Sequence, residues 1–220
     1  MVKELALIHT VTGLVPVFEA LVKEHLPGWK PFNIVDESLL RHTIRDGELS
    51  SARWRRVAGH IFSAIDAGAG AILVTCSSIG PAVDAARPFC PVPLLRVDEG
   101  MADKATDTAN RIGVIATLST TLNPTRDLIR DFANRKGRNP EIIARVCEGA
   151  FDRLMAGDRD GHDILVLSGI QQLAAETDVI VLAQASMANA LKREGAVIPK
   201  VPVLSSPELG VLRLRSQLDG

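Results

Sequence analysis

The stretch Ile72-Leu73-Val74-Thr75-Cys76-Ser77-Ser78 decides the fold, because a similar stretch follows 108 residues later as Ile180-Val181-Leu182-Ala183-Gln184-Ala185-Ser186. In the same way, Leu5-Ala6-Leu7-Ile8-His9-Thr10 is matched 107 residues later by Ile112-Gly113-Val114-Ile115-Ala116-Thr117. Matches at a nearly constant offset indicate an internal duplication. The sequence therefore predicts two similar halves.

A third match places Pro93-Leu94-Leu95 109 residues before Pro202-Val203-Leu204. Between these runs, aliphatic segments alternate with amphipathic ones. Strands are expected at residues 5–10, 32–35, 71–76, 94–97, 112–117, 141–146, 179–184 and 201–204. Helices are expected at residues 16–25, 51–67, 81–87, 101–110, 124–136, 161–177 and 187–194. Apolar strands separated by helices predict an α/β fold with parallel sheets covered on both faces.

Three prolines, Pro16, Pro81 and Pro124, are each expected in a first helical turn, where a missing N–H is tolerated. In open α/β sheets, ligands bind beyond the carboxyl ends of the strands. If both halves turn those ends inward, one cleft is lined by residues 9–12, 76–78, 117–121 and 184–186. The boundary between the halves is expected near residues 98–99.

The composition excludes several classes of function. The chain has 220 residues, 46% hydrophobic and 23% charged, which is typical of a globular protein. A net charge of −1 and few aromatic residues argue against nucleic acid and anionic membranes as partners. No run of about 18 apolar residues is present, and the first apolar run is too short for a signal peptide. A cytoplasmic location is therefore expected.

Cys76, Cys90 and Cys147 are widely spaced and form no CxxC motif, so neither a disulfide framework nor a metal site is expected. Cys90 in a proline-rich loop and Cys147 in a strand-like run are interpreted as structural. The sequence also lacks a GxxxxGK phosphate loop, an HExxH motif and a G-x-S-x-G elbow, and its Gly-Ala-Gly at 68–70 precedes a strand. Phosphoryl transfer, hydride transfer and zinc hydrolysis are therefore disfavoured.

Cys76 is the candidate reacting group. It follows an expected strand and precedes a helix, so the helix dipole is expected to favour its thiolate. Backbone N–H groups and the hydroxyls of Ser77 and Ser78 are expected to hold a carboxylate or enolate oxygen. The alternative is a buried cysteine that only packs. Because a core strand gains little from the hydroxyls around Cys76, the chemical role is favoured.

A second hydroxyl-rich segment, residues 117–121, is expected to be a loop, either capping the next helix or binding a substrate carboxylate. His9 is a candidate general base, although a histidine at a strand end more often packs or hydrogen-bonds. His162 is expected on the surface at a helix start. Glu99 is expected either to reach the cleft or to cap the next helix.

These residues resemble the aspartate/glutamate/hydantoin racemase superfamily. The resemblance is carried by Val74-Thr75-Cys76-Ser77-Ser78, by residues 111–117 and 179–187, by Glu148-Gly149-Ala150-Phe151 and by Val203-Leu204-Ser205-Ser206-Pro207, and it covers the whole chain. It implies two pseudo-symmetric, flavodoxin-like domains with the active site at their interface. Residues 1–98 plus 205–220 are expected to form the first domain, and residues 99–204 the second. It also implies catalysis without cofactors or metals next to a carboxylate or similar carbonyl, and it allows a homo-oligomer.

The resemblance implies one cysteine in each half, on opposite faces of the substrate. The first matches Cys76, whereas the second position falls on Gln184 by the internal alignment. An amide does not exchange a proton usefully near neutral pH, so a symmetric thiol pair is not expected. The related decarboxylases also use one cysteine, but keep the one in the second half.

The sequence thus predicts an enzyme that acts at a carbon next to the carboxylate of a small acid, as a one-sided isomerase, lyase or decarboxylase. Two alternatives stay open: an amino-acid or hydantoin racemase with another second base, His9 or Glu99, and a non-catalytic small-acid binding protein. Cys76 is the expected catalytic residue. The residues expected to bind substrate are His9, Thr10, Thr75, Ser77, Ser78, Thr117, Ser119, Thr120, Gln184, Ala185 and Ser186.

Overall fold

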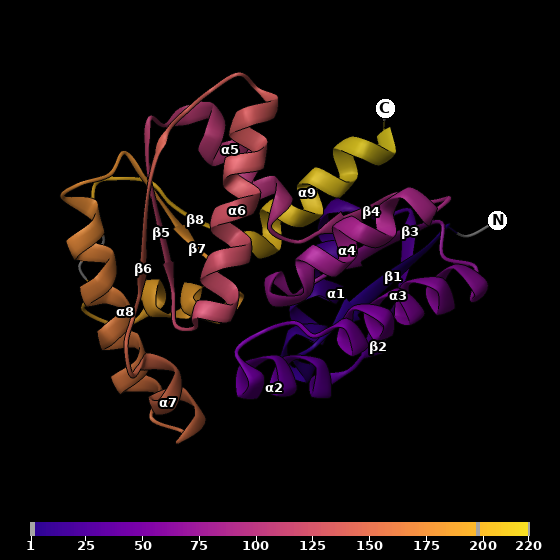
Figure 1. Cartoon of the computed structure of the whole chain (residues 1–220), viewed down its shortest axis with the longest axis horizontal. Coiled ribbons are helices and arrows are strands. Elements are labelled where there is room, and N and C mark those ends of the chain that lie inside the picture. The colour runs from indigo at the N-terminus through magenta and orange to yellow at the C-terminus, as the bar shows by residue number, and fades with distance from the viewer. Residues whose placement is uncertain (1–2, 197–198, 220) are drawn as a thin grey trace. The chain divides into compact units, whose positions relative to one another are not determined.

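The structure is a computed structural model that describes residues 3–196 and 199–219, in two compact units (Figure 1). One unit holds residues 1–100 and 207–220, and the other holds residues 101–206. Each contains a four-stranded parallel sheet with helices packed against it. The prediction of an α/β fold with two similar halves and parallel sheets is confirmed.

The first unit alternates strands with helices and short 3-10 turns. Its strands are β1 (Lys3–His9), β2 (Trp29–Val35), β3 (Ala71–Val74) and β4 (Leu94–Arg96). Its helices are α1 (Val15–His25), α2 (Glu37–Asp46), α3 (Ser51–Asp66), α4 (Gly80–Ala86) and the C-terminal α9 (Ser206–Asp219). The 3-10 turns are η1 (Thr12–Leu14), η2 (Ser77–Ile79) and η3 (Arg87–Phe89).

The second unit repeats this plan. Its strands are β5 (Arg111–Ala116), β6 (Glu141–Val146), β7 (Val179–Leu182) and β8 (Val203–Ser205). Its helices are α5 (Glu99–Thr108), which begins two residues before the boundary, α6 (Ser119–Arg135), α7 (Ala150–Met155) and α8 (Arg159–Ala174). The segment η4 (Ala185–Lys192), expected as an ordinary helix, is a 3-10 helix.

The duplication is visible in the hydrogen bonds of the backbone. The strand order is β2-β1-β3-β4 in one sheet and β6-β5-β7-β8 in the other. The Thr75 N–H donates to the carbonyl of Ile8 over 2.9 Å, and the Ala183 N–H donates to the carbonyl of Ile115 over 2.9 Å. These two bonds are related by the offsets of 108 and 107 found in the sequence, so both halves share one strand register.

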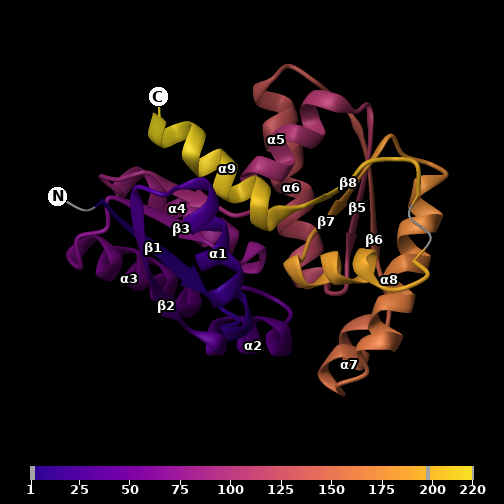
Figure 2. The ribbon, with the colours of Figure 1, turned by 180° about the vertical axis from the view of Figure 1, so that it is seen from behind.

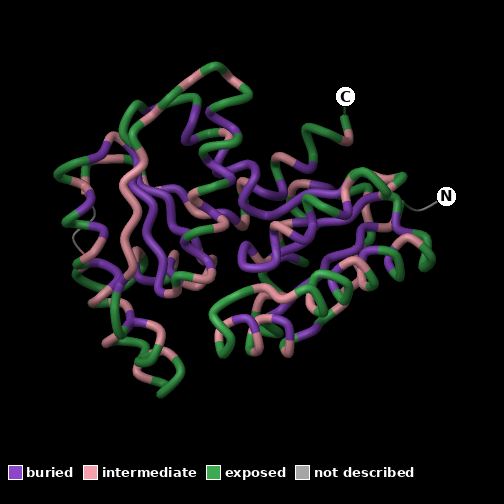
Figure 3. The backbone as a smooth tube through the Cα atoms, in the orientation of Figure 1, coloured by how far each residue is buried: buried purple, intermediate pink, exposed green. Residues whose placement is uncertain are grey.

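In the first unit, alternate residues of β1 and β3 face two separate cores. Ala6, Ile8 and Val74 pack with residues of α2, α3 and α4, whereas Leu7 and Leu73 pack with residues of α1 and α9 (Figures 1 and 2). Because side chains alternate between the faces of a strand, strands covered on both sides need apolar residues at every position. The two central strands are accordingly buried along most of their length (Figure 3).

The second unit is built in the same way. Ile115, Ile180 and Leu182 pack with residues of α7, α8 and η4 on one face of the sheet. Helix α6 contacts β5 and β6. Its buried residues Leu128, Ile129, Phe132 and Ala133 form its apolar stripe. Both units therefore rest on an apolar central strand pair, β1–β3 in one and β5–β7 in the other.

Each expected strand is present, whereas α2, α7 and α9 lie where no helix was expected. The loop predicted for residues 119–121 and the predicted place of Pro124 were wrong. Residues 119–121 form the first turn of α6, since the N–H groups of Thr121 and Leu122 both donate to the carbonyl of Leu118. Pro124 consequently lies inside the helix rather than in its first turn. Hydroxyl-rich residues thus begin a helix that the proline was expected to start.

Among the residues that the structure describes, no helix is long and apolar enough to cross a membrane. The same described residues contain no group of three or more His, Cys, Asp or Glu side chains placed to hold a metal ion.

Helix α9 completes the core of the first unit, although it is far from that unit in sequence. Val211 and Leu214 pack with Phe18 and Val22 of α1. The backbone of Gly210 lies so close to the chain after β4 that a Cβ at this glycine would lie 2.5 Å from the carbonyl oxygen of Val97. The close approach of α9 thus requires a residue without a side chain.

Replacing Gly210 by Ala is expected to destabilise the protein by about 1–3 kcal/mol, because the added methyl group meets a backbone carbonyl that cannot move away easily. Gly59→Ala in α3 is the matched control, since a Cβ there meets no atom within 4 Å. It is expected to be neutral, or stabilising by up to about 1 kcal/mol. Urea unfolding of both variants measures the difference, and equal stabilities would contradict the packing described for α9.

Candidate functional site

Cys76 lies at the carboxyl end of β3 in the first unit. It is the N-cap residue of η2, with an extended backbone (φ −132°, ψ 115°), and the turn leads directly into α4. Neighbouring strands are parallel, so their carboxyl ends meet at one edge of the sheet. The residues that follow β1 therefore lie at the same edge as Cys76.

The sulfur of Cys76 is surrounded by hydrogen-bond donors. Hydrogen bonding from the backbone N–H groups of Ser78 and Ile79 and from the Ser78 hydroxyl lowers the pKa of this thiol, and the Thr10 hydroxyl acts in the same direction. The Thr10 hydroxyl is buried and has no partner at hydrogen-bonding geometry among the described residues, so its effect on the sulfur is that of a nearby polar group. Donors around a sulfur favour its anionic form.

Burial has the larger effect on this thiol. Cys76 is half-buried and packs against the core formed by α2, α3 and α4. Desolvation raises the pKa of the Cys76 thiol above its ordinary value, although the hydrogen bonds from Thr10, Ser78 and Ile79 oppose the shift. The donors at the start of the turn favour the thiolate, as expected, but burial outweighs them. Near neutral pH, Cys76 is therefore a protonated thiol.

His9 is completely buried, and both of its ring nitrogens are used. Nε2 lies 3.0 Å from Oδ1 of Asn33, and Nδ1 lies 2.8 Å from the hydroxyl of Thr75. The Asn33 amide is oriented by its Nδ2 group, which donates to Glu19 over 2.8 Å. Asn33 therefore presents its oxygen to His9, so Nε2 carries the proton. Desolvation lowers the pKa of His9 and keeps the ring neutral.

His9 and Thr75 lie on the face of the sheet opposite to Cys76. His9 follows the alternation of Leu5 and Leu7, and its ring centre lies 5.8 Å from that of Phe18 on the α1 side. Cys76 packs on the other side, with the core that contains Ile8 and Val74. The structure therefore does not bring His9 and Thr75 together with the sulfur, and substrate binding by these two residues stays a prediction.

Ser77 and Ser78 are both buried in the turn after Cys76. Ser78 acts on the sulfur through its N–H and its hydroxyl. The carbonyl of Ser77 accepts a hydrogen bond from the N–H of Gly80, which closes the turn. The two serines thus build the turn around the thiol. That their hydroxyls hold a carboxylate or enolate oxygen stays a prediction.

In the second unit, Gln184 occupies the position that corresponds to Cys76. It follows β7 as the N-cap residue of η4 and has a similar backbone (φ −125°, ψ 136°). Its Oε1 accepts from the Thr117 N–H over 2.6 Å and from the Thr117 hydroxyl over 3.1 Å, and its Nε2 donates to that hydroxyl over 2.9 Å. Gln184 is therefore held across the ends of β5 and β7.

The other predicted residues of the second unit lie in the segments that follow these strands. Ser119 is exposed at the first position of α6, and Ala185 and Ser186 open η4. The Thr120 hydroxyl is buried without a hydrogen-bond partner among the described residues. Thr117, Thr120 and Gln184 are thus gathered at the carboxyl edge of this sheet, as predicted. Their contact with a substrate stays a prediction.

Two further residues differ from or sharpen their sequence interpretation. His162 was expected on the surface but is buried, with its Nδ1 atom 2.7 Å from Asp163. Glu99 is also buried; it accepts from the Arg96 N–H over 3.0 Å and pairs with Arg87. Glu99 thus holds the start of α5. Its ion pair leaves little of the carboxylate for proton transfer.

Cys90 and Cys147 have surroundings that differ from those of Cys76. The Cys90 thiol donates to the carbonyl of Val92 over 3.3 Å. Cys147 is buried in the core that contains Ile115, and desolvation together with the charge of Glu148 raises the pKa of its thiol to about 11. Both fit the structural role predicted for them.

The sequence reasoning missed two polar residues of the first unit, Asn33 and Arg96. Asn33 orients His9, and Arg96 forms a buried ion pair with Asp98. A signal existed for both: each is a polar residue inside an otherwise apolar run, Phe32–Val35 and Leu94–Val97. A polar group in a buried strand requires a partner, and these partners lie on other elements.

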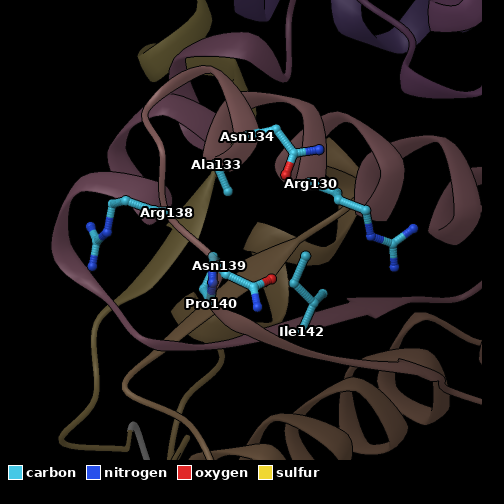
Figure 4. A pocket seen from close by; sticks show the side chains of 7 residues that line it. All are labelled: Arg130, Ala133, Asn134, Arg138, Asn139, Pro140 and Ile142. Atoms are coloured by element: carbon cyan, nitrogen blue, oxygen red, sulfur yellow. The ribbon is translucent and has the colours of Figure 1, made fainter.

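The pocket in Figure 4, of about 190 Å³, lies elsewhere in the second unit. Its lining includes Arg130 and Arg138, at the end of α6 and in the following loop, and Ile142, the second residue of β6. It is therefore at the amino end of the sheet, whereas Thr117 and Gln184 are at the carboxyl end. Arg138 is already engaged by the Thr106 and Ala109 carbonyls. This pocket is not the predicted site.

Comparison with known proteins identifies the family. The family described as Asp/Glu/Hydantoin racemase matches residues 9–214. The chain belongs to this family. It is accordingly an enzyme of the racemase and isomerase type. No curated relative matches the chain by sequence.

Solved racemases share this fold throughout. Glutamate racemase from Francisella tularensis, solved with D-glutamate, matches with a TM-score of 0.76 at 18% identity, over 99% of this chain and 81% of that one. Aspartate racemase from Picrophilus torridus matches with a TM-score of 0.71 at 13% identity, over 97% and 94%. Allantoin racemase from Klebsiella pneumoniae matches with a TM-score of 0.65 at 18% identity, over 99% and 88%.

Replacing His9 by Gln is expected to flatten the pH dependence of stability between about pH 7.5 and about pH 5.5. In the wild type, the pKa of His9 is lower in the folded than in the unfolded chain, so the unfolded chain binds more protons. The free energy of unfolding therefore decreases as the pH is lowered through this window. Asp36, a carboxylate with a lowered pKa, loses its contribution only at more acid pH. Urea unfolding at both pH values tests this, and an equal loss of stability in the variant would contradict it.

Proposed function

We propose that this member of the Asp/Glu/Hydantoin racemase family acts on one face of a carbon next to the carboxylate of a small acid, with Cys76 as its proton-transferring group. The supporting observation is the pair of equivalent N-cap positions, of which one holds a thiol and the other an amide. A thiol transfers a proton near neutral pH, whereas an amide does not. The reaction is therefore one-sided.

The protonation state of Cys76 favours the role of acid. Since burial raises its pKa, the thiol holds a proton that it can deliver to an enolate-like carbon. In a decarboxylation, the bond to the leaving carboxylate breaks, carbon dioxide departs, and the electron pair stays on the α-carbon. The Cys76 S–H bond then breaks, the proton joins that carbon, and water returns a proton to the thiolate. Isomerase and lyase reactions that end in the same protonation are equally included.

Hydrogen-bond donors at the strand ends support the charge on the oxygen atoms of the enolate. We assign this role to Ser77, Ser78, Thr117, Ser119 and Ser186. Donors that are fixed before the reaction stabilise a developing oxyanion without reorganisation. The Nε2 group of Gln184 donates one hydrogen bond to Thr117 and carries a second N–H, which we assign to the substrate.

The two residues considered as a second base are poorly suited to it. His9 is completely buried, and its unprotonated nitrogen is occupied by the hydroxyl of Thr75. Glu99 is paired with Arg87. This argues against a racemase that recruits either one. The proposal further includes a small carboxylate as the partner, catalysis without a cofactor and a cytoplasmic location.

The decisive experiment measures transfer of deuterium from heavy water to the α-carbon of small acids. The panel contains both enantiomers of glutamate and aspartate, allantoin, and α-substituted malonates, analysed by NMR and chiral chromatography. Incorporation with one stereochemical outcome, or stereospecific loss of carbon dioxide, supports the proposal. Equal formation of both enantiomers supports a two-base racemase. Binding of a panel member without exchange or decarboxylation supports the binding-protein alternative.

Replacing Cys76 by Ser is expected to lower kcat by about 10²–10⁴-fold on the substrate found in that screen, because a hydroxyl is a far weaker acid than a thiol. Cys90→Ser is the matched control and is expected to retain wild-type activity, since the Cys90 thiol bonds only a nearby carbonyl among the described contacts. Steady-state kinetics measure both variants. Full activity of Cys76→Ser would remove the mechanism.

Replacing Gln184 by Cys is expected to introduce racemisation, because it places a second thiol at the position equivalent to Cys76. The rate of racemisation should exceed that of Gln184→Ala by at least about tenfold. This is a conservative threshold, because a positioned acid–base group typically contributes about 10²–10⁴-fold. Both variants lose the bond to the Thr117 N–H, so their difference isolates the thiol. Equal product stereochemistry in the two variants would contradict the assigned equivalence.

A further inference from the structure

Arg96 is a buried cation at the carboxyl end of β4. Its side chain is 3% exposed, and it donates to both oxygens of Asp98 over 3.0 and 2.9 Å and to Asp84 over 2.6 Å. Asp98 is completely buried. A buried arginine needs such partners, because an unpaired charge inside a protein costs several kcal/mol. The fork of carboxylates fixes the plane of the guanidinium group.

This guanidinium group lies directly against Gly80, the first residue of α4. A Cβ on Gly80 would overlap the Cζ and Nε atoms of Arg96 and lie 2.5 Å from Nη2. The backbone of Gly80 is ordinary (φ −52°, ψ −42°), so the glycine is not required by a left-handed conformation. Its missing side chain is required by the close approach of Arg96.

Gly80 closes the turn that serves Cys76. Its N–H donates to the carbonyl of Ser77, at the opposite end of η2. Between these two residues lie Ser78 and Ile79, whose N–H groups hydrogen-bond the Cys76 sulfur. The position of Gly80 therefore determines where both donors point. Arg96 lies under this turn and is itself held by Asp98 and Asp84.

We propose that Arg96 and Gly80 form a positioning pair that holds the turn of residues 76–80, and with it the N–H donors, against the Cys76 sulfur. Arg96 makes no direct contact with the reaction in this proposal, and it acts through the backbone of Gly80. The inference deepens the proposed function by explaining how the thiol is held. Its test reads the thiol itself and uses no substrate, so its failure is distinct from failure of the proposed function.

The same ion-pair network provides a control. Arg87 pairs with Asp84 and with Glu99 and is more exposed than Arg96. The side-chain atoms that lie closest to Gly80 belong to Arg96 and not to Arg87. Lysine keeps the positive charge but lacks the flat fork that bonds a carboxylate with two atoms. Both Arg96→Lys and Arg87→Lys therefore keep the charge of the network. Only Arg96→Lys removes the guanidinium group that lies against Gly80.

The experiment measures the rate at which iodoacetamide alkylates Cys76 as a function of pH, with the Cys76 peptide quantified by mass spectrometry. Loss of the Ser78 and Ile79 donors destabilises the thiolate, so Gly80→Ala and Arg96→Lys are expected to slow alkylation by up to about tenfold at a fixed pH, which corresponds to one unit in the thiol pKa. Gly59→Ala and Arg87→Lys are expected to keep the wild-type profile. Circular dichroism verifies folding, and if one test variant fails to fold, the other decides.

The double variant Gly80→Ala with Arg96→Lys separates coupling from general damage. If Arg96 acts through Gly80, the two changes are not additive, and the double variant alkylates no more slowly than the slower single variant. Unchanged or faster alkylation in Gly80→Ala and Arg96→Lys would overturn the proposal, as would fully additive effects in the double variant. Equal slowing in Arg87→Lys would also overturn it, because the network as a whole would then be responsible.

Discussion

The competition between burial and backbone N–H donors at the end of β3 sets the protonation state of Cys76, the residue on which the proposed function depends. Cys76 is carried into the protein by a strand that is apolar on both faces, so its sulfur loses much of its contact with water. The turn of residues 76–80 replaces part of that hydration with two N–H groups and two hydroxyls. Burial is the stronger of the two effects, and the thiol keeps its proton.

The second unit answers the same constraint with a different residue. Any side chain that directly follows a buried parallel strand meets the same lack of water and the same row of N–H groups. Gln184 satisfies this position internally, because its amide oxygen accepts from Thr117 and its amide nitrogen donates back. The internal duplication thus preserved the strand register and the N-cap geometry while the two sites acquired different chemistry.

Much of the fold could be predicted from the sequence, because the apolar runs of the central strands have no other place in a globular protein. The equivalence of Cys76 and Gln184 followed from the same runs, since the register of a parallel sheet fixes which residue leaves the strand. Helix α2 escaped prediction because its many charged residues weaken the apolar pattern. Asp36 caps it by accepting from the Ser38 N–H, and only the fold brings Asp36 to its ion-pair partners Arg56 and His60 of α3.

The place of Cys76 at the end of a strand could be predicted from the sequence, but the electrostatics around its sulfur could not. The sequence shows a cysteine before a helix, and from that pattern a lowered pKa follows. It does not show that α2, α3 and α4 pack around the sulfur, nor that three residues of 3-10 turn separate it from a helix of only seven residues. Likewise, Arg96 was visible as a charge in an apolar run, but Gly80, its partner in space, lies 16 positions earlier.

A thiol that keeps its proton can finish a proton transfer more readily than it can begin one. If Cys76 serves as the acid in the proposed reaction, the electron pair on the α-carbon has to arise without a thiolate base. Loss of carbon dioxide leaves such a pair directly, and the neutral donors at the strand ends suit the enolate that results. Removal of a hydrogen from the α-carbon would instead require the minor, ionised form of Cys76. The burial that raises the pKa of Cys76 therefore favours some of the proposed one-sided reactions over others. It favours those in which the bond that breaks first is not a C–H bond.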